Sequence, residues 1–237
     1  MTRPTLPPFT LETATVTARP SHERHNEKRL MGSTSLIASD VAFTAPVKAL
    51  QARKGSRRAY ERMEQGDGWQ TTISEDLKAE IESQISVFLA TANSVGQPYI
   101  QHRGGPPGFL HVLDDKTIAF ADFSGNRQFI TQGNLSENPK AHLFLIDYAE
   151  RRRIKIWGTA QVVEGDASLM SKLMPSGYKA RPEHVVLFNV TAWDVNCPQH
   201  IPQRFEAADV KAALAARDLR ISELEAELAQ LRSADNS

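Results

Sequence analysis

The sequence contains a single cysteine, Cys197, among 237 residues. One cysteine cannot form a disulfide within the chain, and this fits a reducing compartment. No stretch approaches the about 18 consecutive apolar residues that a membrane-spanning helix needs, and the N-terminus lacks the apolar core of a secretory signal. We therefore expect a soluble, cytoplasmic protein with no membrane partner.

The chain also lacks an excess of charge of either sign, because 28 Lys and Arg residues balance 28 Asp and Glu residues. Without a net field there is no general attraction for nucleic acid, and no nucleic-acid partner is expected. Within residues 1–60, however, basic residues outnumber acidic ones. Either a polyanion-binding tail or a solvated flexible tail explains this local excess.

Motifs of several enzyme classes are missing. The glycine-rich segment 104–108 lacks the Lys-Ser/Thr pair of a phosphate-binding loop, and no nucleophile-elbow sequence occurs. Cys197 and His200 have the spacing of one half of a zinc site, but no second pair of ligands stands nearby. No bound metal is expected.

Composition divides the chain into four regions. Residues 1–44 are rich in Thr, Pro and Ser and predict a flexible N-terminal extension. Residues 45–69 predict a basic helical lead-in, broken at Gly55. Residues 70–205 form the main domain, and residues 206–237 form a C-terminal helix.

The main domain alternates short apolar runs with turn residues. Thr72 and Glu75 have the spacing of a capping box and predict a helix over 73–84. Two more helices are predicted over 126–135 and 167–174. Strands are predicted over 87–91, 98–102, 109–113, 117–122, 141–147, 153–163 and 184–193. This order favours a mainly β protein with helices (α+β), built on a six-stranded antiparallel barrel.

The C-terminal region carries a heptad pattern of about three repeats. Its seam consists of Val210, Leu214, Arg217, Ile221, Leu224, Leu228 and Leu231. One interpretation is a coiled coil between subunits. The other is an amphipathic helix that lies on its own domain, and the sequence does not decide between them.

Basic and polar residues gather at the ends of the predicted strands. Arg103 ends one strand, Asn126 and Arg127 open a predicted helix, and Arg153 and Lys155 share one face of another strand. A helix N-terminus with an arginine in its first turn suits a phosphate group, because free N–H groups and the guanidinium both attract the anion. The alternative is that these charges only solvate the barrel surface.

Three motifs resemble those of the pyridoxamine 5'-phosphate oxidase-like, FMN-binding split β-barrel family. They are Phe120–Gln128, Asn138–Ala141 and Arg153–Ala160. Their order and spacing match from about residue 86 to 165, and the flanking helix and final strand extend the resemblance to roughly 70–205.

The resemblance implies a homodimer that binds FMN at the subunit interface. Arg127 corresponds to the family's phosphate-binding arginine, Arg103 lies near a second one, and Arg153 or Lys155 corresponds to a contact from the partner side. The implied cofactor-binding residues are His102, Arg103, Gly104, Phe120, Ala121, Asp122, Asn126, Arg127, Gln128, Arg153, Lys155, Trp193 and Arg204. His200 is a candidate substrate contact, and no catalytic residue is identified.

The sequence also departs from the family's oxidases. Gln128 replaces a lysine, and residues 198–204 lack the oxidases' C-terminal Arg-Leu-His-Asp-Arg signature. The resemblance therefore implies an FMN-binding oxidoreductase of the oxidase-related type, acting on an unknown small molecule. The alternative is a non-catalytic flavin- or haem-binding module, and the same barrel also hosts deazaflavin enzymes.

Overall fold

The computed structural model describes residues 37–66 and 68–235. Most of the predicted N-terminal extension lies outside these residues. The elements in chain order are η1 (Ala38–Val41), α1 (Ala45–Lys54), α2 (Arg57–Gln65), α3 (Glu75–Ser83), β1 (Ser86–Ala92), β2 (Pro98–Gly104), β3 (His111–Val112), β4 (Thr117–Phe123), α4 (Ile130–Glu137), β5 (Lys140–Asp147), β6 (Arg152–Val163), α5 (Ala167–Leu173), β7 (Pro182–Asn196) and α6 (Ala207–Asp235).

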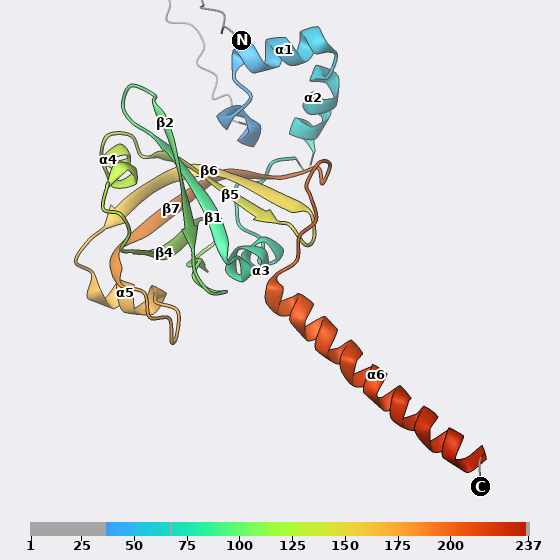
Figure 1. Ribbon diagram of the computed structural model, residues 1–237. Helices are drawn as coiled ribbons and strands as arrows, with labels where there is room; N and C mark the ends of the chain where they lie inside the picture. Colours follow the sequence, from blue (N-terminus) through green and yellow to red (C-terminus); the bar gives the residue numbers. More distant parts are fainter. Residues whose placement is uncertain (1–36, 67, 236–237) are drawn as a thin grey trace, which may run out of the picture. The chain divides into compact units, whose positions relative to one another are not determined.

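The strands form one antiparallel sheet in the order β2-β1-β5-β6-β7-β4-β3, which confirms the predicted α+β class. Its long strands cross one another in a strongly curved arrangement (Figure 1). The sheet has seven strands, one for each of the seven predicted ranges, where a barrel of six was expected. The predicted strand 109–113 shrinks to β3, since Phe109 and Leu110 leave the sheet to fill the core.

The core lies on the concave side of the sheet, where alternate residues of each strand point inward. In β1, for example, Val87 and Leu89 are fully buried while their neighbours are half-buried. Leu77 and Ile81 of α3 pack into the same core. α3 is capped by Ser74, whose Oγ accepts a hydrogen bond from the Leu77 amide at 3.2 Å, so the predicted cap at Thr72 is wrong.

An aromatic stack joins the segment before the barrel to β6. The Trp69 ring stacks on Trp157 of β6, with 4.5 Å between centroids, and Phe43 packs against Trp69 at 5.2 Å. Backbone bonds between Gln70 and Trp193 of β7 hold the same segment. The helical lead-in is thereby attached to the outer face of β6 and β7.

α6 is one uninterrupted helix (Figure 1). Its side chains are exposed at every position from 207 to 234. This contradicts the interpretation of an amphipathic helix covered by its own domain.

No helix among the described residues is long and apolar enough to cross a membrane.

Candidate functional site

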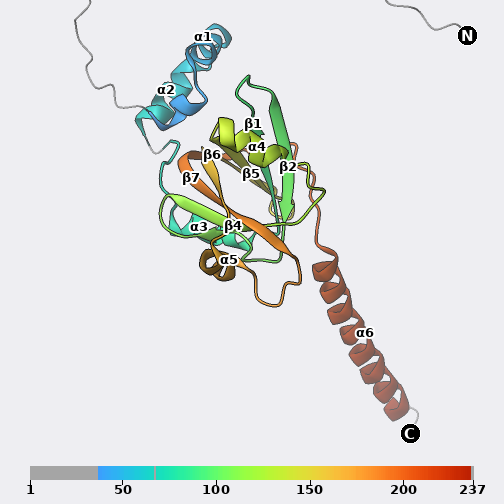
Figure 2. The same cartoon turned by 90° about the vertical axis from the view of Figure 1, so that its left-hand side faces the viewer.

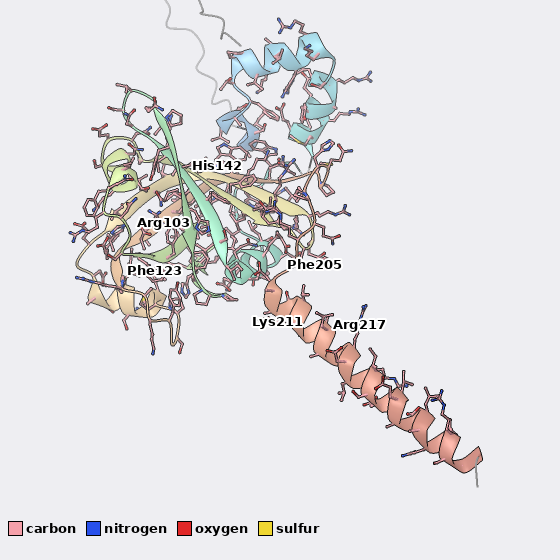
Figure 3. All side chains as sticks on the ribbon, viewed as in Figure 1. Arg103, Phe123, His142, Phe205, Lys211 and Arg217 are labelled. Atoms are coloured by element: carbon pink, nitrogen blue, oxygen red, sulfur yellow. The ribbon has the colours of Figure 1, made fainter. Side chains whose placement is uncertain are left out.

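A pocket of about 200 Å³ opens among β2, β4, the start of β7 and the loop before α4. Arg103 and Phe123, which both line it, are labelled in Figure 3. Its lining consists of Tyr99, Gln101, Arg103, Asp122, Phe123, Gly125, Asn126, Arg127, Gln128, Phe129, Ile130, Thr131, Gln132, Glu183 and His184. Five of the sequence-predicted cofactor residues therefore meet here, namely Arg103, Asp122, Asn126, Arg127 and Gln128.

The pleat of β2 decides which of its residues reach the pocket. Tyr99, Gln101 and Arg103 alternate along the strand and all line the pocket. His102 lies between two of them and faces the other way, where its Nε2 is 2.8 Å from Ser86 Oγ and its ring packs on Phe88. The predicted residue His102 thus lies on the opposite face of the sheet.

The floor of the pocket is a buried carboxylate with two partners. Nε of Arg103 lies 2.6 Å from one oxygen of Asp122, and Nη2 donates to the other oxygen at 3.0 Å. Nε2 of His184 lies 3.1 Å from that second oxygen. β2 and β4 stand far apart in the strand order, so the Arg103–Asp122 pair bridges the open side of the curved sheet.

The loop before α4 has an unusual backbone. Arg127 has φ 60° and Phe129 has φ 54°, both in the left-handed region that residues other than glycine seldom adopt. Asn126 Oδ1 accepts a hydrogen bond from the Gln128 amide at 3.2 Å, which stabilises a turn. The helix therefore starts at Ile130, and the prediction that Asn126 opens it is wrong.

Arg127 is the free cation of the pocket. It is exposed, its guanidinium carbon lies 5.7 Å from the centroid of the Phe129 ring, and it forms no ion pair with any carboxylate of the described residues. Left-handed residues cluster at functional sites because the surrounding structure must hold them there. This observation favours a ligand-binding role for the loop.

The N-terminus of α4 faces the same pocket. Ile130, Thr131 and Gln132 all line it, and no side chain caps this end of the helix. The first amides of a helix have no acceptor within the helix and carry partial positive charge. A buried hydrogen bond of 3.0 Å from Asn134 to Thr91 of β1 holds α4 against the sheet. Figure 2 shows α4 beside β1 and β2.

Two further predicted residues of β4 are part of the core. Phe120 and Ala121 are buried with side chains in the hydrophobic clusters, so only their backbone is available to a ligand. Gly104 ends β2 close to the carbonyl oxygen of Ile85, where a Cβ would be 3.2 Å away. These three positions shape the site without lining the pocket.

The predicted residues of the C-terminal part lie outside the pocket. Trp193 Nε1 donates to the Thr72 carbonyl at 2.8 Å. The guanidinium carbon of Arg204 lies 4.7 Å from the centroid of the Tyr148 ring, and His200 is exposed with φ 64°. In the single chain none of the three shares a site with Arg127.

Arg153 and Lys155 lie on the outer face of β6. Lys155 pairs with Asp194 at 3.2 Å, and its ammonium lies over the Trp69 and Trp157 rings. Arg153 differs, because its Nε is buried and has no hydrogen-bond partner among the described residues. Oδ1 of Asn196, which stands opposite Arg153 on β7, is also buried without a partner.

His142 of β5 lies beside this group. Its ring packs edge-on against Trp157 with 4.8 Å between centroids. Burial, together with the charge of Lys155, lowers the pKa of His142 to about 4. The imidazole is therefore neutral at pH 7.

Among the pocket residues that were not predicted from the sequence are Tyr99, Gln101 and His184. The two-residue period of a strand places Tyr99 and Gln101 on the same face as Arg103. The sequence alone could therefore have predicted that both line the pocket. His184 enters from β7, far along the chain, through the pairing of β7 with β4. No local pattern indicates that contact.

A family model described as pyridoxamine 5'-phosphate oxidase matches residues 73–197, more than half of the chain. No curated protein matches the sequence.

Solved structures show weaker likeness. HupZ of Group A Streptococcus is 19% identical with a TM-score of 0.42, over 56% of this chain and 99% of its own. An FMN-binding protein from Syntrophomonas wolfei is 12% identical with a TM-score of 0.40, over 65% and 98%. The FAD binding protein from Mycobacterium smegmatis is 15% identical with a TM-score of 0.36, over 54% and 97%. The sequence match over 73–197 carries more weight than these scores.

Replacing Asp122 by Asn should lower the free energy of unfolding by about 2–4 kcal/mol, because Arg103 loses its counter-charge in a largely buried place. Asp194→Asn is the matched control, since the Lys155–Asp194 pair is more exposed and should lose under about 1 kcal/mol. Urea unfolding at pH 7 measures both. Equal losses would contradict the structural role assigned to Asp122.

The lowered pKa of His142 predicts acid sensitivity. An unfolded histidine has a pKa of about 6.5, whereas the folded value is about 4. Between these values the unfolded state binds the proton more tightly, so the free energy of unfolding should fall by up to about 3 kcal/mol as the pH decreases through this window. His142→Phe should remove that part of the slope in urea unfolding measured at several pH values. An unchanged slope would refute the assignment.

Proposed function

We propose that this chain, which belongs to the pyridoxamine 5'-phosphate oxidase family, binds FMN in the pocket of Arg127 and acts as an FMN-dependent oxidoreductase on a small molecule. We also propose that it works as a homodimer in the cytoplasm. The carrying observation is the coincidence of an unpaired arginine and an uncapped helix N-terminus at one pocket.

The pocket suits the phosphate of FMN. A dianionic phosphate accepts charge-assisted hydrogen bonds from a guanidinium and from helix N-terminal amides. Arg127 and the amides of Ile130 and Thr131 offer both kinds of donor. Arg103 is already neutralised by Asp122, so Arg127 supplies most of the attraction and Arg103 shapes the floor.

The size of the pocket supports a second copy of the chain. Sites that bury a ligand of drug size enclose about 300–1,000 Å³, whereas one chain encloses about 200 Å³. One chain therefore holds the phosphate end, and the ring system requires a further wall. The unpartnered polar atoms of Arg153 and Asn196 on the outer face of β6 and β7 would meet the partner or its cofactor.

FMN, when bound, supplies the redox chemistry itself, and the protein sets its position and surroundings. His184 is the pocket residue whose imidazole suits proton transfer, because Asp122 fixes one of its nitrogens and leaves the ring oriented. Tyr99 and Gln101, which hydrogen-bond to each other, supply polar groups from β2. The substrate class is left unassigned, because the sequence differs from that of the oxidases at Gln128 and at residues 198–204.

Titration of the purified chain with FMN tests the cofactor. We expect saturable quenching of flavin fluorescence, with one FMN per chain. A Soret band in the protein as purified would instead support the haem-binding alternative. A colourless protein that leaves flavin fluorescence unchanged would refute the proposal.

Replacing Arg127 by Ala should weaken FMN binding about 10- to 100-fold, since a hydrogen bond to a charged group contributes about 1.5–3 kcal/mol. Arg151→Ala is the matched control, because Arg151 is also exposed with a positive φ of 51° but does not line the pocket. The same fluorescence titration measures both variants. Equal FMN affinities of the two variants would contradict the assignment of Arg127 to the FMN site.

A further inference from the structure

α6 presents an apolar seam that its own chain leaves uncovered. Seam side chains such as Leu214 and Leu231 are 54% and 64% exposed. Near the start of the helix, Phe205, Val210, Ala213 and Leu214 line an apolar groove, and Figure 3 labels Phe205, Lys211 and Arg217 in this part. An apolar stripe on an exposed helix, here interrupted once by Arg217, marks an interaction surface.

The seam has the pattern of a coiled coil. Its residues alternate spacings of four and three, which places Leu214, Ile221 and Leu228 at a positions of the heptad. The d positions are Val210, Arg217, Leu224 and Leu231. The same helix from a second copy offers the matching surface, because a heptad seam packs against another heptad seam.

The charges beside the seam favour a parallel, in-register pair. In that arrangement each g residue faces the following e residue of the partner. Glu206 then faces the partner's Lys211, Arg220 faces the partner's Glu225, and Glu227 faces the partner's Arg232. All three contacts join opposite charges, and symmetry doubles each of them.

An antiparallel pair meets repulsion instead. There e residues face e residues. When the two seams overlap fully, Lys211 faces the partner's Arg232 and Asp218 faces the partner's Glu225. Both e contacts would join like charges. The g residues also face each other, and there Arg220 meets the partner's Glu227, the one contact of opposite charge in this register. Repulsive contacts therefore outnumber attractive ones.

The seam has one charged member, Arg217 at a d position, where the two copies of Arg217 face each other and form one charged layer at a cost in stability. In the parallel pair this side chain lies next to the partner's e residue, which is Asp218. The g residue that would otherwise face Asp218 is Ala213, so this carboxylate is free for Arg217. A single polar layer in a seam specifies register, because any shift places the charge against apolar side chains.

We propose that α6 pairs with α6 of a second copy of this chain as a parallel, in-register, two-stranded coiled coil. This inference does not rest on FMN binding. It adds an interface between subunits that lies outside the barrel.

Disulfide cross-linking in the full-length chain tests the pairing. Cys197, the single native cysteine and an exposed one, is first replaced by Ser. Leu231→Cys should then form a covalent dimer under mild oxidation, because identical d residues face each other in a parallel pair. Ala226→Cys is the matched control: it lies at the outward f position of the same helix and should not cross-link.

The direction of the pair needs a mixed experiment. Leu214→Cys and Leu231→Cys chains are combined, oxidised and digested, and the linked peptides are identified by mass spectrometry. In a parallel pair these positions lie about 25 Å apart, too far for a disulfide, so only links between identical positions should form. A link from 214 to 231 would overturn the parallel arrangement, and no link at Leu231→Cys would overturn the pairing.

A charge exchange checks the register in the Leu231→Cys chain. Glu227→Lys should slow cross-linking about three- to tenfold, because it replaces attraction to the partner's Arg232 by repulsion. Adding Arg232→Glu should restore the rate, since the two charges are then exchanged. If the double variant cross-links no faster than Glu227→Lys alone, the proposed register is wrong.

Discussion

The arrangement of this site depends on the buried ion pair between Arg103 and Asp122. The sheet places β2 at one edge and β4 near the other, so no backbone hydrogen bonds join them. The carboxylate of Asp122 closes that gap by contacting Arg103 of β2 and His184 of β7 at once. A buried pair of this kind contributes little net stability compared with apolar packing, but it specifies a geometry, because either partner alone is costly to bury.

Because of this ion pair, the two arginines of the pocket, Arg103 and Arg127, have different roles. Arg103 is ion-paired with the Asp122 carboxylate and donates one hydrogen bond to it through Nη2, so it has little charge left for a ligand. Arg127 keeps its charge available because it forms no ion pair within the described residues. The left-handed turn at 127 and 129 comes before α4, which starts only at Ile130. Had the helix begun at Asn126, its first amides would lie elsewhere. The left-handed turn therefore places both the Arg127 side chain and the uncapped N-terminus of α4 at the pocket.

The strands followed from the sequence because alternation and turn residues are local signals. β1, β2 and β4 to β7 lie within a few residues of the predicted runs, and the heptads of α6 were visible as well. Pocket membership was harder to predict. His102 and Arg103 are neighbours in the sequence, yet the pleat sends them to opposite faces. His184 and the closure between β2 and β4 depend on contacts between distant strands, which no local pattern encodes.

The segment between β7 and α6 connects the two proposed interfaces. Its residues are fixed to the turn between β5 and β6: Gln203 donates to the Ala149 carbonyl at 2.9 Å, and the Arg204 amide bonds to the Tyr148 carbonyl. Arg204, implied by the family resemblance as a cofactor contact, also fixes this segment to the barrel through Tyr148. A parallel coiled coil is two-fold symmetric about its own axis, and so is a cyclic dimer of barrels. If both interfaces join the same two copies, the two axes must coincide. The tether at Tyr148 then sets where each α6 leaves its barrel, and therefore which barrel faces can meet.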